Sequence, residues 1–349
     1  MYPSTSPIDL IRYLVVWQVN SSLVWLPSCL SAEISQVLGA TIAERLPTRE
    51  AAPWRKALAP WEGFKIGDKR AAFPQASWPT EAVLFVYPGK RTYGQGELIL
   101  WELKLMGESA DHGRFLEVIL PAMEAAATTS DPRWHHQNSL WGQFNIHAVY
   151  AARGNRWEPV VQEGKLDLSY HVTPVQWAEG LASIANAERL YDNLTWLTPF
   201  DFSPAGSKAP GRKKIPADQA PTLPKILQAL VARMTDLLPG KYHTPDDLWN
   251  SLGGEGRSAL QQAMEDAARI PVQQHKFSRA PKDWPGNWIG TQSFSFIPPT
   301  LVPYLELASI LHVGKQTHFG CGTFSITCRV PVYECTWPEY HLASYKSSR

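Results

Sequence analysis

The first half of the chain alternates short apolar runs with longer segments in which apolar residues recur at helical spacing. Runs rich in Leu, Ile, Val and aromatic residues predict strands at 10–20, 81–87, 96–107 and 141–154, with a further hairpin over 158–172. Helical periodicity predicts helices at 31–46 and 114–127. Ser31 is a candidate cap for the first helix, and Pro121 predicts a kink or a boundary in the second. The Pro- and Trp-rich stretch from 47 to about 80 is expected to be irregular.

The strand at 96–107 shows which of its faces is apolar, because side chains alternate between the two faces of a strand. One face carries Ile99, Trp101, Leu103 and Leu105. The other carries Leu98, Leu100, Glu102 and Lys104. The first face is the drier one, so we predict a half-buried strand.

The second half of the chain repeats this order of elements. A helix at 175–190 is expected to connect the halves, and an extended segment at 194–206 leads into a Pro/Lys/Arg-rich loop at 207–221. Helical spacing predicts helices at 222–238, 256–269 and 301–311. Extended segments are predicted at 275–279, 288–298 and 322–333.

Together the two halves predict an α+β protein built from two tandem ferredoxin-like (RRM-like) βαββαβ domains, each a four-stranded sheet with helices on one face. We place the N-terminal domain at 1–174 and the C-terminal domain at 175–349.

Charge does not indicate a nucleic-acid-binding protein by itself. The chain has 33 Lys plus Arg against 32 Asp plus Glu, a net charge of +1. Any electrostatic footprint for nucleic acid must therefore be local. Hydrophobic residues make up 44% of the chain, as in globular proteins.

Cysteine spacing and hydropathy limit the cellular context. Cys29, Cys321, Cys328 and Cys335 form no C-x-x-C pair and no zinc spacing with histidine, so we expect reduced thiols in a cytoplasmic protein and no metal. The apolar segment 10–26 is interrupted by polar residues, which favours a buried strand over a signal peptide. No run reaches 18 unbroken apolar residues, so no membrane span is expected.

A glycine-rich loop at 312–322, HVGKQTHFGCG, is the segment richest in candidate chemistry. Gly314, Gly320 and Gly322 allow positive φ and let backbone N–H groups approach a phosphate closely. Lys315 adds a point charge, and histidines at 312 and 318 transfer protons near neutral pH. The alternative is a tight helix-to-strand turn that needs glycine for geometry alone. A nucleotide-binding P-loop is excluded, because its spacing requires Gly at 309 and Ser or Thr at 316, where Ser309 and Gln316 stand.

Residues 300–326, TLVPYLELASILHVGKQTHFGCGTFSI, resemble the C-terminal signature of the CRISPR precursor-RNA processing endoribonucleases of the RAMP superfamily. Three further segments fall where that family would place them: 96–107 with the following helix and strand, 197–206, and 275–296. The resemblance covers roughly 96–330 and is diffuse outside 300–326.

The resemblance implies metal-independent cleavage of a repeat RNA. The ribose 2′-OH attacks the neighbouring phosphate and leaves a 2′,3′-cyclic phosphate and a 5′-OH, which requires a base, an acid and cations for the phosphorane. It implies precursor CRISPR RNA as the partner, with other CRISPR effector subunits as further candidates, and no cofactor and no membrane.

Many family members carry their general-base histidine on the first helix, but this chain has no histidine before His112. We therefore take His312 and Lys315 as first candidates for catalysis. His135 and His136 come next. Tyr13, Arg45, Lys56 or a loop histidine are other groups that would replace the missing histidine, and the remaining alternative is catalysis by positioning and charge alone. His147 is expected to pack in a strand, and His243 and His341 to lie in surface loops.

Three groups of basic residues are candidates for RNA binding besides Gly314, His318, Gly320 and Gly322. Arg212, Lys213 and Lys214 lie in a Pro/Gly loop that would grip a phosphate backbone. Lys276, Arg279 and Lys282 are interleaved with Trp284 and Trp288, as on RNA-binding sheets. Arg45, Arg49, Arg55 and Lys56 gather near the end of the first helix, where the family places its cleavage site. In each case an ordinary solvated surface is the alternative.

Two other functions compete with RNA cleavage. The same fold would hold a processed guide RNA in an effector complex without cutting it, and the missing histidine in the first domain favours this. A purely structural subunit is the third candidate, supported by the low net charge. No motif of a metalloprotease, a serine hydrolase or a paired acidic metal site appears.

Overall fold

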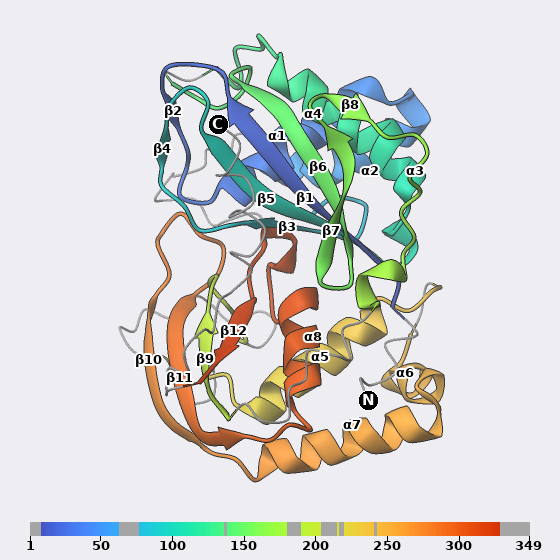
Figure 1. Ribbon diagram of the computed structural model, residues 1–349, viewed down its shortest axis with the longest axis vertical. Helices are drawn as coiled ribbons and strands as arrows, with labels where there is room; N and C mark the ends of the chain where they lie inside the picture. The colour runs from blue at the N-terminus through green and yellow to red at the C-terminus, as the bar shows by residue number, and fades with distance from the viewer. Residues whose placement is uncertain are drawn as a thin grey trace.

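The computed structural model describes residues 8–62, 77–135, 138–179, 190–203, 215, 220–240 and 243–328. Its first sheet has the order β3-β5-β1-β6-β7-β8 and is antiparallel throughout (Figure 1). These strands are β1 (Leu10–Val19), β3 (Ala82–Val86), β5 (Leu98–Met106), β6 (Phe144–Arg153), β7 (Arg156–Gln162) and β8 (Lys165–Leu166). The first four have the order of a ferredoxin-like βαββαβ unit, and the hairpin of β7 and β8 extends the sheet. Glu163 (φ 50°) and Gly164 (φ 73°) form its tight turn, whose positive φ values match the twist of the flanking strands.

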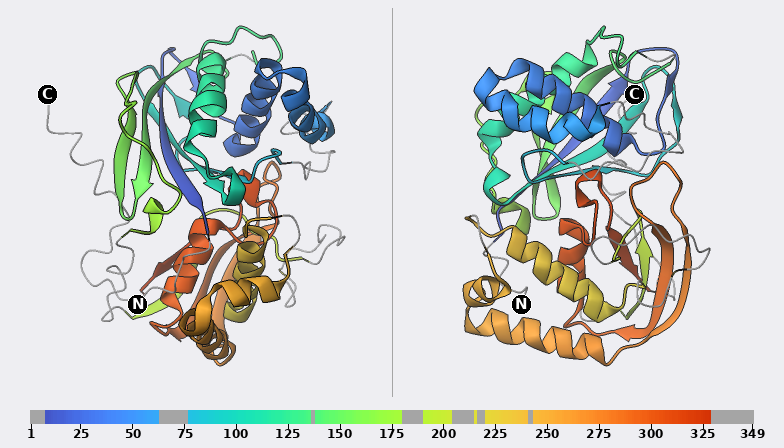
Figure 2. Two further views of the ribbon diagram at one scale, coloured as in Figure 1. Left: turned by 90° about the vertical axis from the view of Figure 1, so that its right-hand side faces the viewer. Right: turned by 180° about the vertical axis from the view of Figure 1, so that it is seen from behind.

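Helices cover one face of this sheet (Figure 2). They are α1 (Leu30–Arg45), α2 (Thr48–Leu58), η1 (Ala59–Trp61), α3 (His112–Arg114), the π-helical η3 (Phe115–Ile119) and α4 (Leu120–Ala127). The π-helical segment ends next to Pro121, whose missing N–H interrupts the regular hydrogen bonds and confirms the expected boundary. The short strands β2 (Val24–Trp25) and β4 (Thr92–Tyr93) pair beside this domain, and η2 (Gly107–Ser109) follows β5.

The second sheet has the order β10-β11-β9-β12, again that of a ferredoxin-like unit. Its strands are β9 (Tyr191–Trp196), β10 (Val272–Arg279), β11 (Trp288–Ile297) and β12 (Phe324–Thr327). The helices of this half are α5 (Leu223–Asp236), α6 (Pro245–Ser251), α7 (Gly253–Ala268) and α8 (Val302–Leu311), with η4 (Gln176–Ala178) before β9 and η6 (Thr317–Phe319) before β12. The prediction of two tandem ferredoxin-like units is therefore confirmed.

Each sheet packs against its helices through one apolar core. The core of the second domain also includes residues of the first domain. It includes Leu10, Val83 and Met106 from the first sheet together with Leu230 and Met234 of α5. In Figure 1 the second domain accordingly lies directly beneath the lower end of the first sheet. The two units thus share a packed interface and are not joined by a linker alone.

The strand prediction for 96–107 was wrong about its second face. Ile99, Trp101 and Leu103 are buried as expected, but Glu102 and Lys104 are also buried, at 2% and 3% exposure. The reason is the second domain, which covers this end of the open sheet face. The charged residues therefore face another domain instead of water.

Several local expectations also need correction. The stretch after residue 47 is not irregular throughout, because Thr48–Leu58 forms α2 with Pro53 inside it; Ala51 and Trp54 bury one side of this helix and compensate for the missing hydrogen bond. Ser31 does not cap α1, whose N-cap is Cys29. Helix α6 was not anticipated.

Some predictions fall largely outside the described residues. Of the helix expected at 175–190, the structure describes residues 175–179, which include η4, and residue 190. Of the loop at 207–221, it describes residues 215, 220 and 221. Residues 329–333 of the last predicted strand lie outside. The boundary between 174 and 175 stays a prediction. Within the described part of the chain, no helix is long and apolar enough to cross a bilayer.

Candidate nucleic-acid interface

The glycine-rich loop lies between α8 and β12 and is inserted against the first domain (Figure 1). Ser31 Oγ of α1 donates to Phe319 O at 2.7 Å. His318 contacts both α1 and β3 of that domain. The loop therefore connects the two domains, a placement that the spacing of its residues does not reveal.

The three glycines are required by close packing against protein backbone. A Cβ at Gly320 (φ +76°) would lie 2.5 Å from Leu84 O, and one at Gly322 (φ +84°) would lie 2.0 Å from Val313 O. At Gly314 (φ +93°) the nearest atom would be Asp201 O at 2.8 Å. The loop is therefore a tight helix-to-strand turn that needs glycine for its geometry. Gly314 is exposed, whereas Gly320 and Gly322 are buried.

Many backbone N–H groups of the loop are bonded within the protein. The following donate to backbone carbonyls: Val313, Lys315, Phe319, Gly320 and Gly322. A concavity that binds phosphate needs N–H groups that point at the ligand. These five groups are therefore not available to a ligand in the described conformation.

His312 is enclosed at the domain interface. Its Nδ1 lies 3.1 Å from both Gly320 O and Cys321 O, and its Nε2 lies 2.9 Å from Lys104 Nζ. Because Nδ1 faces two acceptors and Nε2 faces an ammonium donor, the imidazole is neutral with its proton on Nδ1. Burial, and next the Lys104 charge, lower the pKa of His312 well below its ordinary value.

Lys104 fastens the end of α8 to the first sheet. Its Nζ donates to Ile310 O at 2.8 Å as well as to His312. A cation beside the last carbonyls of a helix stabilises the negative end of the helix dipole. Burial lowers the pKa of Lys104 to about 8. His312 and Lys104 thus form a buried hydrogen-bonded contact between the two domains.

His318 makes a second buried hydrogen-bonded contact between the two domains. Its Nδ1 donates to Ala82 O at 2.8 Å, and its Nε2 accepts from Ser35 Oγ at 2.7 Å. Burial lowers the pKa of His318 to about 4. The ring is therefore neutral at physiological pH, in contact with α1 and β3.

Lys315 lies on the other side of the loop and is half-buried. Its Nζ donates to Ser203 Oγ at 3.2 Å, and its N–H donates to Asp201 O at 3.0 Å. Gly314 next to it is exposed. Of the two residues first considered for catalysis, Lys315 is the one near the surface.

The basic residues of β10 separate onto different surfaces. Lys276 pairs with Thr291, which pairs with Thr195 of β9, which pairs in turn with Ser325 of β12. Directly paired residues share a face, so Lys276 begins a row of hydroxyl side chains across the sheet. Arg279 lies three residues further along β10, so its side chain projects from the opposite face of the sheet. Its guanidinium lies 5.2 Å from the ring centre of Trp288.

The remaining basic candidates lie elsewhere. Lys282 is exposed in the turn between β10 and β11. Arg45, Arg49, Arg55 and Lys56 are exposed on α1 and α2. The loop contacts α1 at Ser31 and Ser35, and at about 1.5 Å per residue Arg45 lies roughly 15 Å further along the helix. Arg212, Lys213 and Lys214 lie outside the described residues.

The other catalytic candidates are mostly enclosed or remote from the loop. Tyr13 is buried, with its hydroxyl 2.8 Å from His112 Nδ1, and burial raises its pKa. His135 is exposed and its Nε2 lies 2.9 Å from Thr129 O. His147 and His243 are half-buried. His136 and His341 lie outside the described residues.

A cleft between the domains, of about 380 Å³, was missed by sequence reasoning. It is lined by Arg12, Glu102 and Lys104 on one side and by Ser309 and Thr323 on the other, among other residues. Arg12 Nε donates to Glu102 Oε1 at 2.5 Å, which holds the pKa of this carboxyl below its ordinary value despite burial. The available signal was a pair of charged residues inside an otherwise apolar strand.

Residues 194–324 match the family model for the CRISPR-associated endoribonuclease Cas6. The resemblance to the repeat-RNA processing family is confirmed. The match begins in β9, includes the whole glycine-rich loop and ends in β12. No curated protein matches the chain.

Solved structures show the same fold over nearly the whole chain. Two structures entitled Cas6-RT-Cas1–Cas2 complex and its partial form each have a TM-score of 0.50 and 13% identity over 93% of this chain. This chain spans only 46% of the length of the matched chain in the partial complex and 29% of the length of the matched chain in the other structure. A Cas6 product complex matches over 91% of this chain and 100% of its own, with a TM-score of 0.45 and 17% identity. The two matches with a TM-score of 0.50 show that the shared fold extends over both domains.

Proposed function

We propose that the protein binds CRISPR repeat RNA and cleaves it as a metal-independent endoribonuclease. The observation that carries this proposal is the family match over 194–324, which includes the glycine-rich loop. The second ferredoxin-like unit and the exposed cations on α1, α2 and β10 support it, because RNA binding requires positive surface that the net charge of +1 does not supply.

The proposed reaction is an internal transesterification. The 2′-oxygen forms a bond to phosphorus and gives its proton to a base, the bond from phosphorus to the 5′-oxygen breaks, and the leaving oxygen takes a proton. The products are a 2′,3′-cyclic phosphate and a 5′-OH. Lys315 is the group proposed to stabilise the additional negative charge of the phosphorane, and the cations of α1 and α2 are proposed to bind other phosphates of the RNA.

A catalytic role of His312 stays a prediction. Its ring is wholly buried, and both of its nitrogens are engaged within the protein. This geometry favours a positioning role, in which His312 and Lys104 hold the loop so that Lys315 lies at the surface. Proton transfer is then the task of other groups or of water.

Cleavage without metal is tested by incubating the protein with its repeat RNA in excess EDTA. We expect a single cut in each repeat and a product with a cyclic-phosphate end, detected by its resistance to phosphatase until acid treatment. Tight binding without a cut would overturn the nuclease proposal and leave RNA binding in place.

Variants separate the roles of the two loop residues. Lys315→Gln is expected to lower the single-turnover cleavage rate roughly 100-fold, the order measured for single donors that stabilise transition-state charge. His312→Gln retains a hydrogen-bonding side chain, and for a positioning role it should lower the rate while leaving the midpoints of its pH profile unchanged. A shift of a midpoint would instead show that His312 transfers a proton.

RNA binding without cleavage is the second candidate function. The burial of His312 and His318 favours it, because neither ring of the loop faces the surface. Since the chain spans 46% of a longer chain in a matching structure entitled a partial Cas6-RT-Cas1–Cas2 complex, a role beside RT, Cas1 and Cas2 partners is part of this second proposal.

A further inference from the structure

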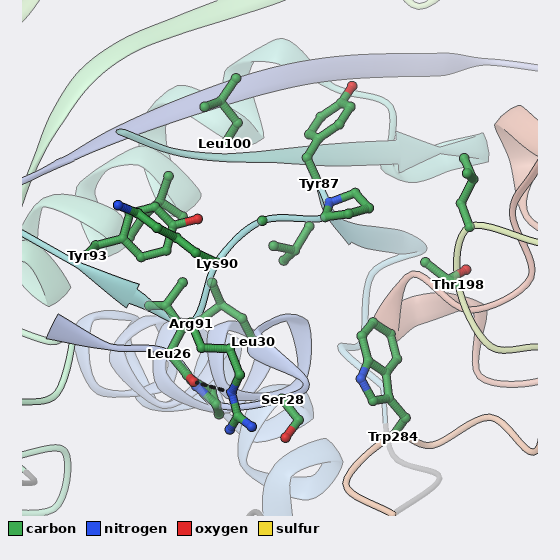
Figure 3. A pocket seen from close by; sticks show the side chains of 16 residues that line it. Leu26, Ser28, Leu30, Tyr87, Lys90, Arg91, Tyr93, Leu100, Thr198 and Trp284 are labelled. Atoms are coloured by element: carbon green, nitrogen blue, oxygen red, sulfur yellow. Dashed lines mark hydrogen bonds between the residues drawn. The ribbon is translucent and has the colours of Figure 1, made fainter. Parts of the chain in front are cut away.

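A second pocket, of about 210 Å³, lies between the domains on the side of the β2–β4 ribbon (Figure 3). The first domain supplies most of its wall. The second domain supplies Leu197, Thr198 and Trp284, the last from the turn between β10 and β11. The volume is below the roughly 300–1,000 Å³ of pockets for drug-sized ligands, so it suits one ring system.

The wall of this pocket is apolar and partly aromatic. Leu26, Leu30 and Leu100 line it together with the rings of Tyr87 and Trp284 (Figure 3). The Tyr87 hydroxyl is directed out of the pocket, toward Glu102 Oε2 at 3.4 Å, so its ring and not its polar end faces the pocket. Such a wall accepts the face of a flat ring.

Polar groups stand at the mouth of the pocket. Lys90 and Arg91 are both exposed. Arg91 Nε donates to Leu26 O at 3.4 Å, and Lys90 Nζ lies 5.2 Å from the centre of the Tyr93 ring and is bonded to Glu97. Two adjacent cations beside an apolar slot match a ligand with a flat ring and a nearby negative charge.

The surface around the mouth of the pocket also carries an exposed aromatic ring and a further cation. Trp25, at 56% exposure, is paired with Thr92 in the β2–β4 ribbon, next to Arg91. Lys282 is exposed two residues from Trp284. Two anions are also present: Glu97 is bonded to Lys90, and Asp283 accepts from Ser28 at 2.7 Å and holds the turn against the first domain.

We propose that this pocket binds one unpaired base of a single-stranded RNA, with the adjoining phosphate on Arg91 and Lys90. A base has the flat ring that the pocket accommodates, and its phosphate has the charge that the two cations complement. A base-paired strand does not expose a base for insertion. The inference rests on the proposed function, because its ligand is RNA, and it adds a base-binding position built from both domains.

The position is tested by photocrosslinking and by binding. An oligouridylate containing 4-thiouridine is irradiated with the full-length protein, and the crosslinked peptides are mapped by mass spectrometry. We expect a crosslink to the peptide that holds Trp284 or to the one that holds Tyr87. Binding curves are then measured for the oligouridylate and for its duplex with oligoadenylate.

Trp284→Ala is expected to lower affinity for the single strand about 5- to 100-fold, and affinity for the duplex far less. Trp284 also packs near Trp61 and Phe319, so its truncation can disturb the fold. Trp284→Phe, which keeps an aromatic ring, should restore most of the affinity. Arg91→Gln should weaken the single-strand complex and lower the slope of log affinity against log salt by about 0.7. Arg269→Gln, which removes an exposed cation at the end of α7, is the control and should change little.

The outcomes distinguish this inference from the proposed function. If the wild type binds and cuts repeat RNA but shows no crosslink at either peptide, and Trp284→Phe, Trp284→Ala and Arg91→Gln bind like the control, the pocket assignment is wrong and the endoribonuclease proposal stands. Equal losses for single strand and duplex would show a general cationic surface and overturn the base pocket. Failure of the wild type to bind RNA would overturn both.

Discussion

His318 illustrates at the scale of one residue how burial changes chemistry. Its ring is 7% exposed and bonded to Ala82 and Ser35 of the first domain. A histidine in this setting no longer takes up a proton near pH 6.5, the property that made it a candidate for proton transfer. The same burial makes the stability of the fold depend on pH.

We expect the free energy of unfolding to fall as pH drops from 6.5 toward 4. The pKa of His318 is lowered from 6.5 to about 4, so between these values the unfolded chain binds a proton that the folded chain does not. The contribution is complete above pH 6.5, is lost as pH falls, and amounts to on the order of 3 kcal/mol. His318→Gln should make this part of the profile shallower, measured by urea unfolding across the range, while His312, whose pKa is also lowered, retains part of the dependence.

His275→Gln is the matched control for this measurement, because His275 is exposed on β10. Its profile should run parallel to that of the wild type. A His318→Gln profile that also ran parallel would show that the folded protein protonates His318 as readily as the unfolded chain does.

At the scale of elements, the glycine-rich loop is a turn that locks α8 and β12 to the first sheet. Gly320 packs against the backbone of β3, where a side chain would meet Leu84 O at 2.5 Å. The loop therefore needs glycine both for its positive φ and for the close approach of two segments.

Substitution separates these two requirements. Gly320→Ala should lower the free energy of unfolding by about 3 kcal/mol or more, since it combines backbone strain with a steric clash. Gly96→Ala is the control: Gly96 has a similar φ of +83° but open space around it, so it should cost only the strain, about 1–2 kcal/mol. Chemical denaturation of both variants measures the difference. Equal losses would mean that β3 moves aside and that the loop is not a tight joint.

At the scale of the whole molecule, the proposed RNA affinity would come from separated cations on a nearly neutral protein. The described structure places them on α1 and α2, on β10 and beside the β2–β4 ribbon. Each phosphate contact releases counterions and adds to the salt dependence of binding.

Lys276→Gln should therefore weaken binding of single-stranded RNA to a similar degree for all sequences. It should also lower the slope of log affinity against log salt by about 0.7. The measurement is a set of binding titrations at several salt concentrations, compared with Arg269→Gln. An unchanged slope would place Lys276 and its row of hydroxyls outside the RNA path.

The amino-acid sequence by itself determined the order of the elements, because strand and helix periodicities are local. Both βαββαβ units, the boundary at Pro121 and the glycine-rich loop could be predicted from residues close together in the chain. Helix α2 was not predicted because proline usually interrupts a helix and Pro53 lies inside it. Burial of Ala51 and Trp54 stabilises the helix in the folded protein.

Only the tertiary structure decided which side chains meet. Lys104 and His312 are 208 residues apart in sequence, and His318 and Ser35 are 283 apart. Burial of a charged or titratable group depends on what another domain places over it, and no periodicity within one strand carries that information. This is why Glu102 was expected at a half-buried surface and why the loop histidines were expected to face a ligand. The same packing creates the two pockets between the domains.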